Sequence, residues 1–431
     1  MKPDAASSAP ISAQDTRRET IWGIWAMIGA FGCYFCMYGF RRPFTAAAYS
    51  DTSVGSLGFK AVLVTSQVAG YMLSKFIGIK IIAELPAQRR ARTLLWLVLW
   101  AEAALVLFAL TPRPWNAAWL FLNGLSLGMV FGLVLGYLEG RRLTEALTAG
   151  LCASFILADG ATKSIGTWLL NLGVAEDSMP CVAGILFLPP LAIFVAMLAR
   201  VPPPSARDIA ARAQRFTMNR AQRWDFLRRH AAGLIPLVLM YLAVTIVRSI
   251  RSDFAPEIWQ SMGSAAAPSS FTQTELWVAL GVLIANGGAV LISDNRRAFL
   301  VSLATCGLGL CLLPVALLGH SGGLFSTFDF MVLIGLGLYL PYVAVHTTVF
   351  ERLLAITREH GNLGFLMYVA DAVGYLGYVA VMFSYQVNPA HDDVLGLLRG
   401  AAWLTFGLSS ICLILCGAYY ARPPAPAANL G

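Results

Sequence analysis

The chain has 431 residues, of which 58% are hydrophobic and 13% are charged, and 31 basic and 23 acidic residues give a formal net charge of +8. Soluble domains carry about 25% charged residues, so this composition excludes an ordinary soluble protein. It indicates a polytopic membrane protein.

Apolar stretches of about 17 to 25 residues, the length that crosses a bilayer, recur about twelve times. The chain begins with a polar tail, Met1 to Thr20, and the apolar segment after it is too long for the core of a signal peptide. We therefore expect an uncleaved first span. The expected spans lie near residues 20 to 40, 57 to 82, 93 to 111, 115 to 138, 146 to 171, 180 to 200, 232 to 256, 274 to 293, 298 to 318, 327 to 350, 362 to 386 and 396 to 420.

Pro202, Pro203 and Pro204 open the one clear linker, which is rich in Arg, Gln and Ala and divides the spans into six and six. Two six-span halves joined by a basic linker are typical of the major facilitator architecture. The predicted fold class is an all-α polytopic membrane protein of about 12 transmembrane helices in two six-helix halves. The predicted divisions are a cytoplasmic tail at 1–20, the N-terminal half at 21–200, the basic cytoplasmic linker at 201–231, the C-terminal half at 232–421 and a cytoplasmic tail at 422–431.

Basic residues gather on one side of the membrane if the spans alternate. The other side carries Arg113 and several acidic residues, and is otherwise nearly devoid of Lys and Arg. The positive-inside rule then places both termini in the cytoplasm of a multi-pass protein of the inner (plasma) membrane. The linker would meet anionic lipid, and we expect no nucleic-acid partner. The basic clusters are Arg17 and Arg18, Arg89, Arg90 and Arg92, Arg141 and Arg142, the linker, Arg296 and Arg297, and Arg352 and Arg358.

The chain shows no signature of an enzyme. Nearly all of its eight cysteines lie inside spans, and the CxxC spacing of Cys33 and Cys36 lacks His or Cys partners, so packing is the simpler reading. We find no Ser-His-Asp set, no metal-ligand spacing and no phosphate-binding glycine loop. We therefore expect no catalysis, no metal and no cofactor.

Span 4 carries Gly124, Gly128, Gly132 and Gly136 at i, i+4 spacing. Such a stripe lets helices approach closely. It is compatible with static packing and with a sliding surface alike.

Arg41 follows the apolar run of span 1, and Arg248 lies in the run of span 7. An Arg near a helix centre costs roughly 2.5 to 3.5 kcal/mol, whereas a good apolar residue gains only about 0.3 to 0.6 kcal/mol. The two arginines either snorkel to the interface or face the bundle interior for a functional reason. Spans 1 and 7 are equivalent in the predicted architecture, and this symmetry favours function.

Five short motifs in chain order surround these arginines. They resemble the organophosphate:phosphate antiporters of the major facilitator superfamily, typified by glycerol-3-phosphate and hexose-6-phosphate transporters. The motifs are Tyr38-Gly39-Phe40-Arg41-Arg42-Pro43-Phe44, Gly70-Tyr71-Met72-Leu73-Ser74-Lys75-Phe76, Val247-Arg248-Ser249-Ile250-Arg251-Ser252-Asp253-Phe254-Ala255-Pro256, Tyr339 to Pro341 with Glu351, and Gly374-Tyr375-Leu376-Gly377.

The resemblance implies that Arg41 and Arg248 bind the phosphate group between the halves and that Lys75 is a supporting cation. The physics agrees, because the arginine fork binds phosphate oxygens in a bidentate way. Exchange of one anion for another follows if the empty site, in which two like charges lie close together, resists closing and a bound anion relieves the repulsion. Further candidate binding residues are the motif tyrosines Tyr38, Tyr71 and Tyr375, together with Tyr342.

The sequence departs from that family at two carboxylates. Asp159 and Lys163 lie one turn apart in span 5, where the family tends to have His, and Asp371 lies in span 11, where it usually has a small residue. If all face the cavity, the site keeps a net charge of about +2 and still favours an anion. Each carboxylate is a candidate counter-ion, proton-coupling group or contact for a substrate amine. The alternative is that Asp159 and Lys163 only neutralise each other.

The sequence leaves the gating mechanism undecided at two other places. His346 in span 10, near Tyr342, is a candidate proton-linked switch or a packing residue. The loop of residues 82–90 lacks the superfamily's Gly-rich Asp-Arg motif, and Glu84 stands in for the gating Asp. We therefore expect an inner gate of different construction.

The sequence thus predicts a monomeric secondary transporter of a small anionic, phosphorylated metabolite, working by alternating access in exchange for phosphate. Its partners would be the anionic substrate, the bilayer and a counter-ion, phosphate or protons. The alternatives are a proton-coupled transporter of another organic solute and a transporter-like membrane sensor.

Overall fold

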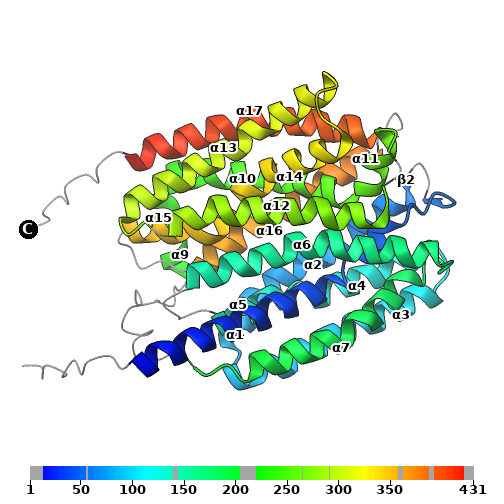
Figure 1. Cartoon of the computed structure of the whole chain (residues 1–431), viewed down its shortest axis with the longest axis horizontal. Helices are drawn as coiled ribbons and strands as arrows, with labels where there is room; N and C mark the ends of the chain where they lie inside the picture. Colours follow the sequence, from blue (N-terminus) through cyan, green and yellow to red (C-terminus); the bar gives the residue numbers. More distant parts are fainter. Residues whose placement is uncertain are drawn as a thin grey trace, which may run out of the picture.

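The computed structural model describes residues 13–54, 57–138, 144–203, 220–264, 266–290, 292–357, 363–387 and 393–421. Long helices lie side by side along the longest axis of the molecule (Figure 1). We call the end at which α1 begins and α17 ends the terminal end, and the end near α11 and β2 the distal end.

The N-terminal half contains the helices before the predicted linker. Its turn after α1 holds a short 3-10 helix and a two-stranded antiparallel hairpin that pairs Ser53 with Gly58, a detail that the apolar pattern does not predict. The elements are α1 (Ala13–Tyr38), η1 (Pro43–Ala46), β1 (Ser53–Val54), β2 (Leu57–Gly58), α2 (Phe59–Glu84), α3 (Ala87–Leu110), α4 (Ala117–Leu127), α5 (Val130–Leu138), α6 (Thr144–Asn171) and α7 (Met179–Ala199).

The C-terminal half follows α9, a helix within the region predicted as linker. Each expected span corresponds to one long helix, except that spans 4 and 10 are each built from consecutive helices. The elements are α9 (Arg220–Arg229), α10 (Ala231–Asp253), α11 (Ala255–Ser261), α12 (Pro268–Val290), α13 (Asn295–Ser321), α14 (Thr327–Ala344), the π-helix η2 (Val345–Val349), α15 (Phe350–Thr357), α16 (Leu363–Val387) and α17 (Val394–Ala421).

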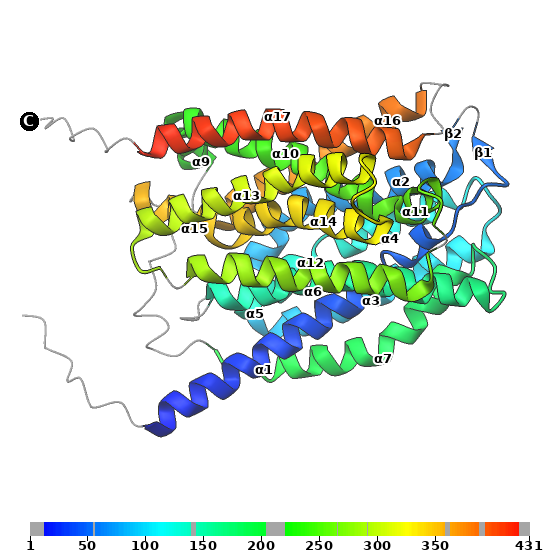
Figure 2. The ribbon, with the colours of Figure 1, turned by 45° about the horizontal axis from the view of Figure 1, so that its top comes forward.

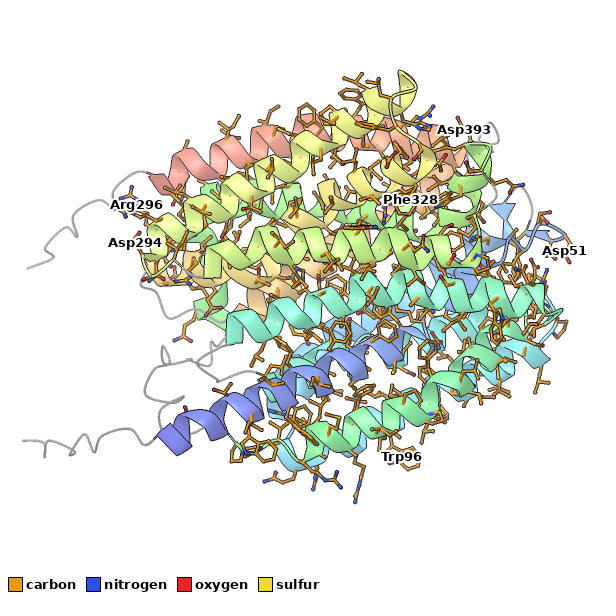
Figure 3. The ribbon with its side chains drawn as sticks, viewed as in Figure 1. Asp51, Trp96, Asp294, Arg296, Phe328 and Asp393 are labelled. Carbon is orange, nitrogen blue, oxygen red and sulfur yellow. The ribbon has the colours of Figure 1, made fainter. Side chains whose placement is uncertain are left out.

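The outside of the bundle is apolar. Within the described residues, nine helical segments are long and apolar enough to cross a membrane. Trp96, on the outside of the bundle, is 67% exposed (Figure 3), and many large aliphatic side chains elsewhere are also exposed. An apolar surface of this extent is unfavourable in water and matches a lipid environment. The chain is therefore a multi-pass membrane protein.

Charged side chains lie at both ends of the bundle. Asp51 and Asp393 lie at the distal end, and Arg296 lies beside Asp294 at the terminal end (Figure 3). Arg113 at the distal end forms ion pairs with Asp51, Glu176 and Asp177. Other basic positions named above, Arg141, Arg142, Arg358 and most of the linker, lie outside the described residues.

The halves meet along two pairs of helices. In both views α6 lies beside α12 (Figures 1 and 2), and α2 packs along α16. Within the halves, α1 packs on α7 and α10 on α17. Residues on α2, α6, α10 and α16 are therefore positioned to meet across the interface.

The glycine stripe of span 4 brings α4 against α2. A Cβ added at Gly124 would lie 2.1 Å from the carbonyl oxygen of Gln67, and one at Gly70 would lie 2.0 Å from that of Phe121. Only glycine permits backbones to approach this closely. This contact fixes the level of α2, which carries Tyr71 and Lys75 toward the other half.

Candidate functional site

The turn after α1 is held in place by hydrogen bonds from α2 and α4. Gln67 donates from Nε2 to the carbonyl oxygen of Arg41 at 2.9 Å and to Oδ1 of Asn123 at 2.8 Å. Asn123 in turn donates to the carbonyl oxygen of Phe40 at 3.0 Å. Buried polar groups that satisfy one another in this way fix the backbone, so Arg41 has a defined position although it lies outside a helix.

The Arg41 side chain is only 2% exposed and lies on tyrosine rings. Its guanidinium carbon is 3.9 Å from the ring centroid of Tyr71 and 5.6 Å from that of Tyr38. No carboxylate in the described part of the chain pairs with it, and its buried Nε has no acceptor there. Aromatic faces attract a cation without neutralising it.

Arg248 repeats this arrangement in the other half, on α10. It is 3% exposed, and its guanidinium carbon lies 4.4 Å from the ring centroid of Tyr342 and 5.7 Å from that of Tyr339. Its Nη2 is 3.5 Å from Oγ of Ser249, and its Nε likewise lacks an acceptor among the described residues.

Tyrosines connect the two arginines. Tyr375 on α16 and Tyr38 lie near both guanidiniums. Tyr375 also meets Tyr71 edge to face, with centroids 5.3 Å apart, across the interface between the halves. Arg41 and Arg248 therefore belong to one aromatic site, which we call the arginine site.

Every other buried Lys or Arg that the structure describes has a carboxylate partner. These pairs are Arg42 with Asp159 and Asp253, Lys163 with Asp159, Lys60 with Glu257, Lys75 with Asp371, and Arg251 with Glu275. The uncompensated buried positive charges in these residues are thus those of Arg41 and Arg248.

A cluster of ionic groups lies on the distal side of the arginine site. Arg42 pairs with Asp159 of α6 at 3.1 Å and with Asp253 of α10. Asp159 also pairs with Lys163 and accepts a hydrogen bond of 2.8 Å from Ser252. The set, completed by Tyr378 donating to Asp253 at 2.7 Å, joins the two halves. We call it the distal cluster.

A second cluster lies on the terminal side. Lys75 of α2 pairs with Asp371 of α16 at 2.8 Å. The second oxygen of Asp371 accepts from the Tyr241 hydroxyl at 2.5 Å and lies 3.3 Å from Nε2 of His346. All four side chains are buried, and Lys75 with Asp371 again joins the halves. We call this set the terminal cluster.

The order of these layers can be followed along α16. Asp371, Tyr375 and Tyr378 lie about one helical turn apart and contact the terminal cluster, the arginine site and the distal cluster in turn. Contacts between the halves therefore lie on both sides of the arginine site.

The structure distributes the predicted site residues over these three layers. Arg41, Arg248, Tyr38, Tyr71, Tyr342 and Tyr375 lie in the arginine site, Asp159 and Lys163 in the distal cluster, and Lys75, His346 and Asp371 in the terminal cluster.

The structure bears on three alternatives that the sequence left open: snorkelling of the arginines, a self-contained Asp159–Lys163 pair, and carboxylates acting as counter-ions of the arginines. Snorkelling is excluded for Arg41 and Arg248 by their burial. The pair of Asp159 with Lys163 exists but is not self-contained, because Asp159 also pairs with Arg42. Neither Asp159 nor Asp371 forms an ion pair with the two arginines in the described residues. The side chain of Glu84 lies outside the described part.

Sequence reasoning missed several residues that hold the site. Gln67, Asn123, Tyr241 and Tyr378 are polar groups inside apolar spans, and that isolation was the available signal. Arg42 and Asp253 stood within the recognised motifs, but nothing in the sequence linked them. Their pairing across the halves needed the structure.

Comparisons with known proteins identify the family and the fold. Residues 43–423 match the family DUF5690, described as a family of unknown function, so the chain belongs to that family. No curated protein sequence matches the chain.

Solved transporter structures resemble it over nearly their whole length. A bacterial homologue of the human lysosomal transporter Spinster, inward-facing and unoccupied, has a TM-score of 0.60 at 13% identity, covering 94% of this chain and 99% of that one. A bacterial homologue of the iron transporter ferroportin, in an outward-facing state, has a TM-score of 0.59 at 15% identity, covering 93% of this chain and 100% of that one. The xylose transporter XylE from E. coli, in a partially occluded inward-open conformation, has a TM-score of 0.59 at 11% identity, covering 93% of this chain and 99% of that one. The likeness shows that the chain has the predicted major facilitator fold.

Proposed function

We propose that this member of the DUF5690 family is a secondary transporter. It moves a small anion of the phosphorylated-metabolite class across the membrane by alternating access, and Arg41 and Arg248 hold the anion. The solved structures that resemble this chain are those of transporters, which supports the general class.

One observation carries the proposal: these two arginines are the buried cations without a carboxylate partner in the described residues. Removing one partner of a buried ion pair costs about 3–5 kcal/mol, which indicates how unfavourable an uncompensated buried charge is. A bound anion would remove this penalty. Two guanidinium charges match a dianion, and two planar forks match the oxygens of a phosphate group.

The distal and terminal clusters supply the gates of the cycle. Both join the two halves, one on each side of the arginine site. Breaking the pair between Arg42 and Asp253 opens a path on the distal side, and breaking the pair between Lys75 and Asp371 opens one on the terminal side. The bound anion reduces the repulsion between Arg41 and Arg248, so that both gates close more readily around it than around the empty site.

The orientation and the mode follow the sequence prediction. The protein lies in the inner membrane with its terminal end facing the cytoplasm. Arg296 at the terminal end and the acidic residues Asp51 and Asp393 at the distal end accord with this orientation (Figure 3). The transporter works as a monomer, and the resemblance in its motifs favours exchange with phosphate. A sensor would bind the anion at this site without moving it.

Counterflow in proteoliposomes tests the proposal. Vesicles loaded with phosphate are assayed for uptake of labelled phosphate and of a panel of organophosphates. Arg41→Lys should reduce uptake at least tenfold, because Lys cannot form the bidentate fork. The matched control is Arg251→Lys, on an equally buried arginine that already pairs with Glu275. Full uptake in Arg41→Lys would refute the anion clamp, and binding without uptake in the parent protein would indicate the sensor.

A further inference from the structure

We propose that His346 is a proton-binding site, and that the proton it holds moves with the anion. The inference rests on the proposed function and specifies its coupling ion. It is carried by the positions of the two ring nitrogens and by the tyrosines that the terminal cluster shares with the arginine site.

Both nitrogens of His346 face acceptors. Nδ1 is 3.1 Å from the carbonyl oxygen of Tyr342, which can only accept a hydrogen bond. Nε2 is 3.3 Å from Oδ1 of Asp371, an ionised carboxylate oxygen paired with Lys75. The Tyr241 hydroxyl, 3.4 Å from Nε2, already donates its hydrogen to Asp371. A neutral imidazole has one N–H and would leave one of these contacts without a hydrogen. The doubly protonated ring satisfies both.

The backbone supports a specialised position. His346 lies in η2, the single π-helical turn Val345–Val349 between α14 and α15. Single π-turns within a helix are frequent at functional sites, because they redirect side chains at a cost in regular hydrogen bonding. Here the irregular turn follows Pro341 and brings His346 against Tyr241 and Asp371.

The groups around His346 come from every neighbouring element. Tyr342 of α14 stacks on its ring with centroids 4.8 Å apart, and Tyr241 of α10 lies at 5.3 Å. Phe131 of α5 meets the ring edge to face at 6.4 Å. The charged groups are Asp371 of α16 and, beyond it, Lys75 of α2. Cys152 of α6 lies near Asp371, and Ser302 of α13 bonds Thr348 rather than the histidine.

Two tyrosines link the terminal cluster to the arginine site. Tyr342 lies between Arg248 and the ring of His346, and Tyr71 contacts both Arg41 and Lys75. An anion held by the arginines is thus one aromatic ring away from His346. Because the anion attracts the positive charge of the protonated ring, each should strengthen the binding of the other, as linkage requires.

The proton step involves one group. Neutral His346 takes up a proton on Nε2 from hydronium of the aqueous phase while the site is open and receives the anion, and the imidazolium then completes the terminal cluster on Asp371. When that cluster opens and the anion leaves, Nε2 returns the proton to water. Lys75 and Asp371 keep their charges throughout. Net transport therefore carries one proton with each anion, whereas one-for-one exchange of anions needs no net proton movement.

Transport of labelled inorganic phosphate under a pH gradient tests this coupling. With one proton per anion, a gradient of one pH unit changes the equilibrium accumulation by about tenfold, with acid on the side from which phosphate enters. Net uptake should lose this dependence in His346→Gln and keep it in His320→Gln, a histidine at the distal end whose Nδ1 contacts the carbonyl oxygen of Phe325. Counterflow in the parent protein and in His320→Gln should ignore the gradient. An equal response of His346→Gln and His320→Gln would overturn the inference, whereas absence of any counterflow would overturn the proposed function instead.

A spectroscopic measurement does not depend on transport. Ring-nitrogen NMR of the protein labelled on its five histidines should show, at neutral pH, the signal of a doubly protonated ring that is absent from His346→Gln. If that variant does not fold, replacing the other four histidines one at a time assigns the signal by elimination. A neutral tautomer of His346 at pH 7, with phosphate bound, would refute the proton site.

Discussion

The comparison of Arg248 with Arg251 gives the sharpest prediction. The two residues lie one turn apart on α10 and are almost equally buried. The guanidinium of Arg251 already has acceptors, because Nη1 donates to Glu275 at 2.7 Å and Nη2 to the carbonyl oxygen of Met331 at 2.8 Å. Arg248 has no carboxylate partner among the described residues. The same Arg→Lys substitution should therefore weaken anion binding at position 248 and lower the stability of the protein at position 251.

The magnitudes follow from the bonds lost. Lys at 248 keeps the charge but removes one arm of the fork; a hydrogen bond to a charged group contributes about 1.5–3 kcal/mol. The Kd for phosphate should rise about 10- to 150-fold, with little change in the stability of the empty protein. Lys at 251 cannot reach both Glu275 and Met331, so unfolding should become easier by about 1.5–3 kcal/mol for each bond lost, with Kd changed less than about threefold.

Calorimetric titration with phosphate and thermal unfolding, both in detergent, measure the two effects. An unchanged Kd in Arg248→Lys would show that the guanidinium does not contact the anion. A Kd raised equally in Arg251→Lys would show that the loss reflects disturbed packing. Either result would refute the assignment of Arg248 to anion binding.

Three further predictions concern stability. Phosphate at 100 times its Kd should stabilise the parent protein by about 2.7 kcal/mol, and Arg41→Gln should abolish this shift in thermal unfolding. Asp371→Asn should destabilise by about 3–5 kcal/mol, because buried Lys75 loses its counter-charge; adding Lys75→Asn should restore most of that loss, and failure of the double variant to do so would contradict the pairing. Gly124→Ala should destabilise by about 1–3 kcal/mol through overpacking, whereas Gly23→Ala, where a Cβ meets nothing within 4 Å, should be nearly neutral.

The sequence by itself determined the membrane class, the helical spans and the two candidate arginines. These follow from local quantities: the length of an apolar run must match the bilayer, and a guanidinium in such a run is costly enough to require a reason. The glycine stripe of span 4 likewise indicated that helices can approach closely there. The substrate-binding roles of Arg41 and Arg248 remain predictions.

Only the tertiary structure decided which charges pair. Asp159 is four residues from Lys163, yet it also meets Arg42, which lies far away in the chain, and Asp371 meets Lys75 from the other half. Charge attraction depends on distance in space, and packing of the two halves sets those distances. The sequence could count cations and carboxylates, but only the fold could show that Arg41 and Arg248 have no carboxylate partner among the described residues.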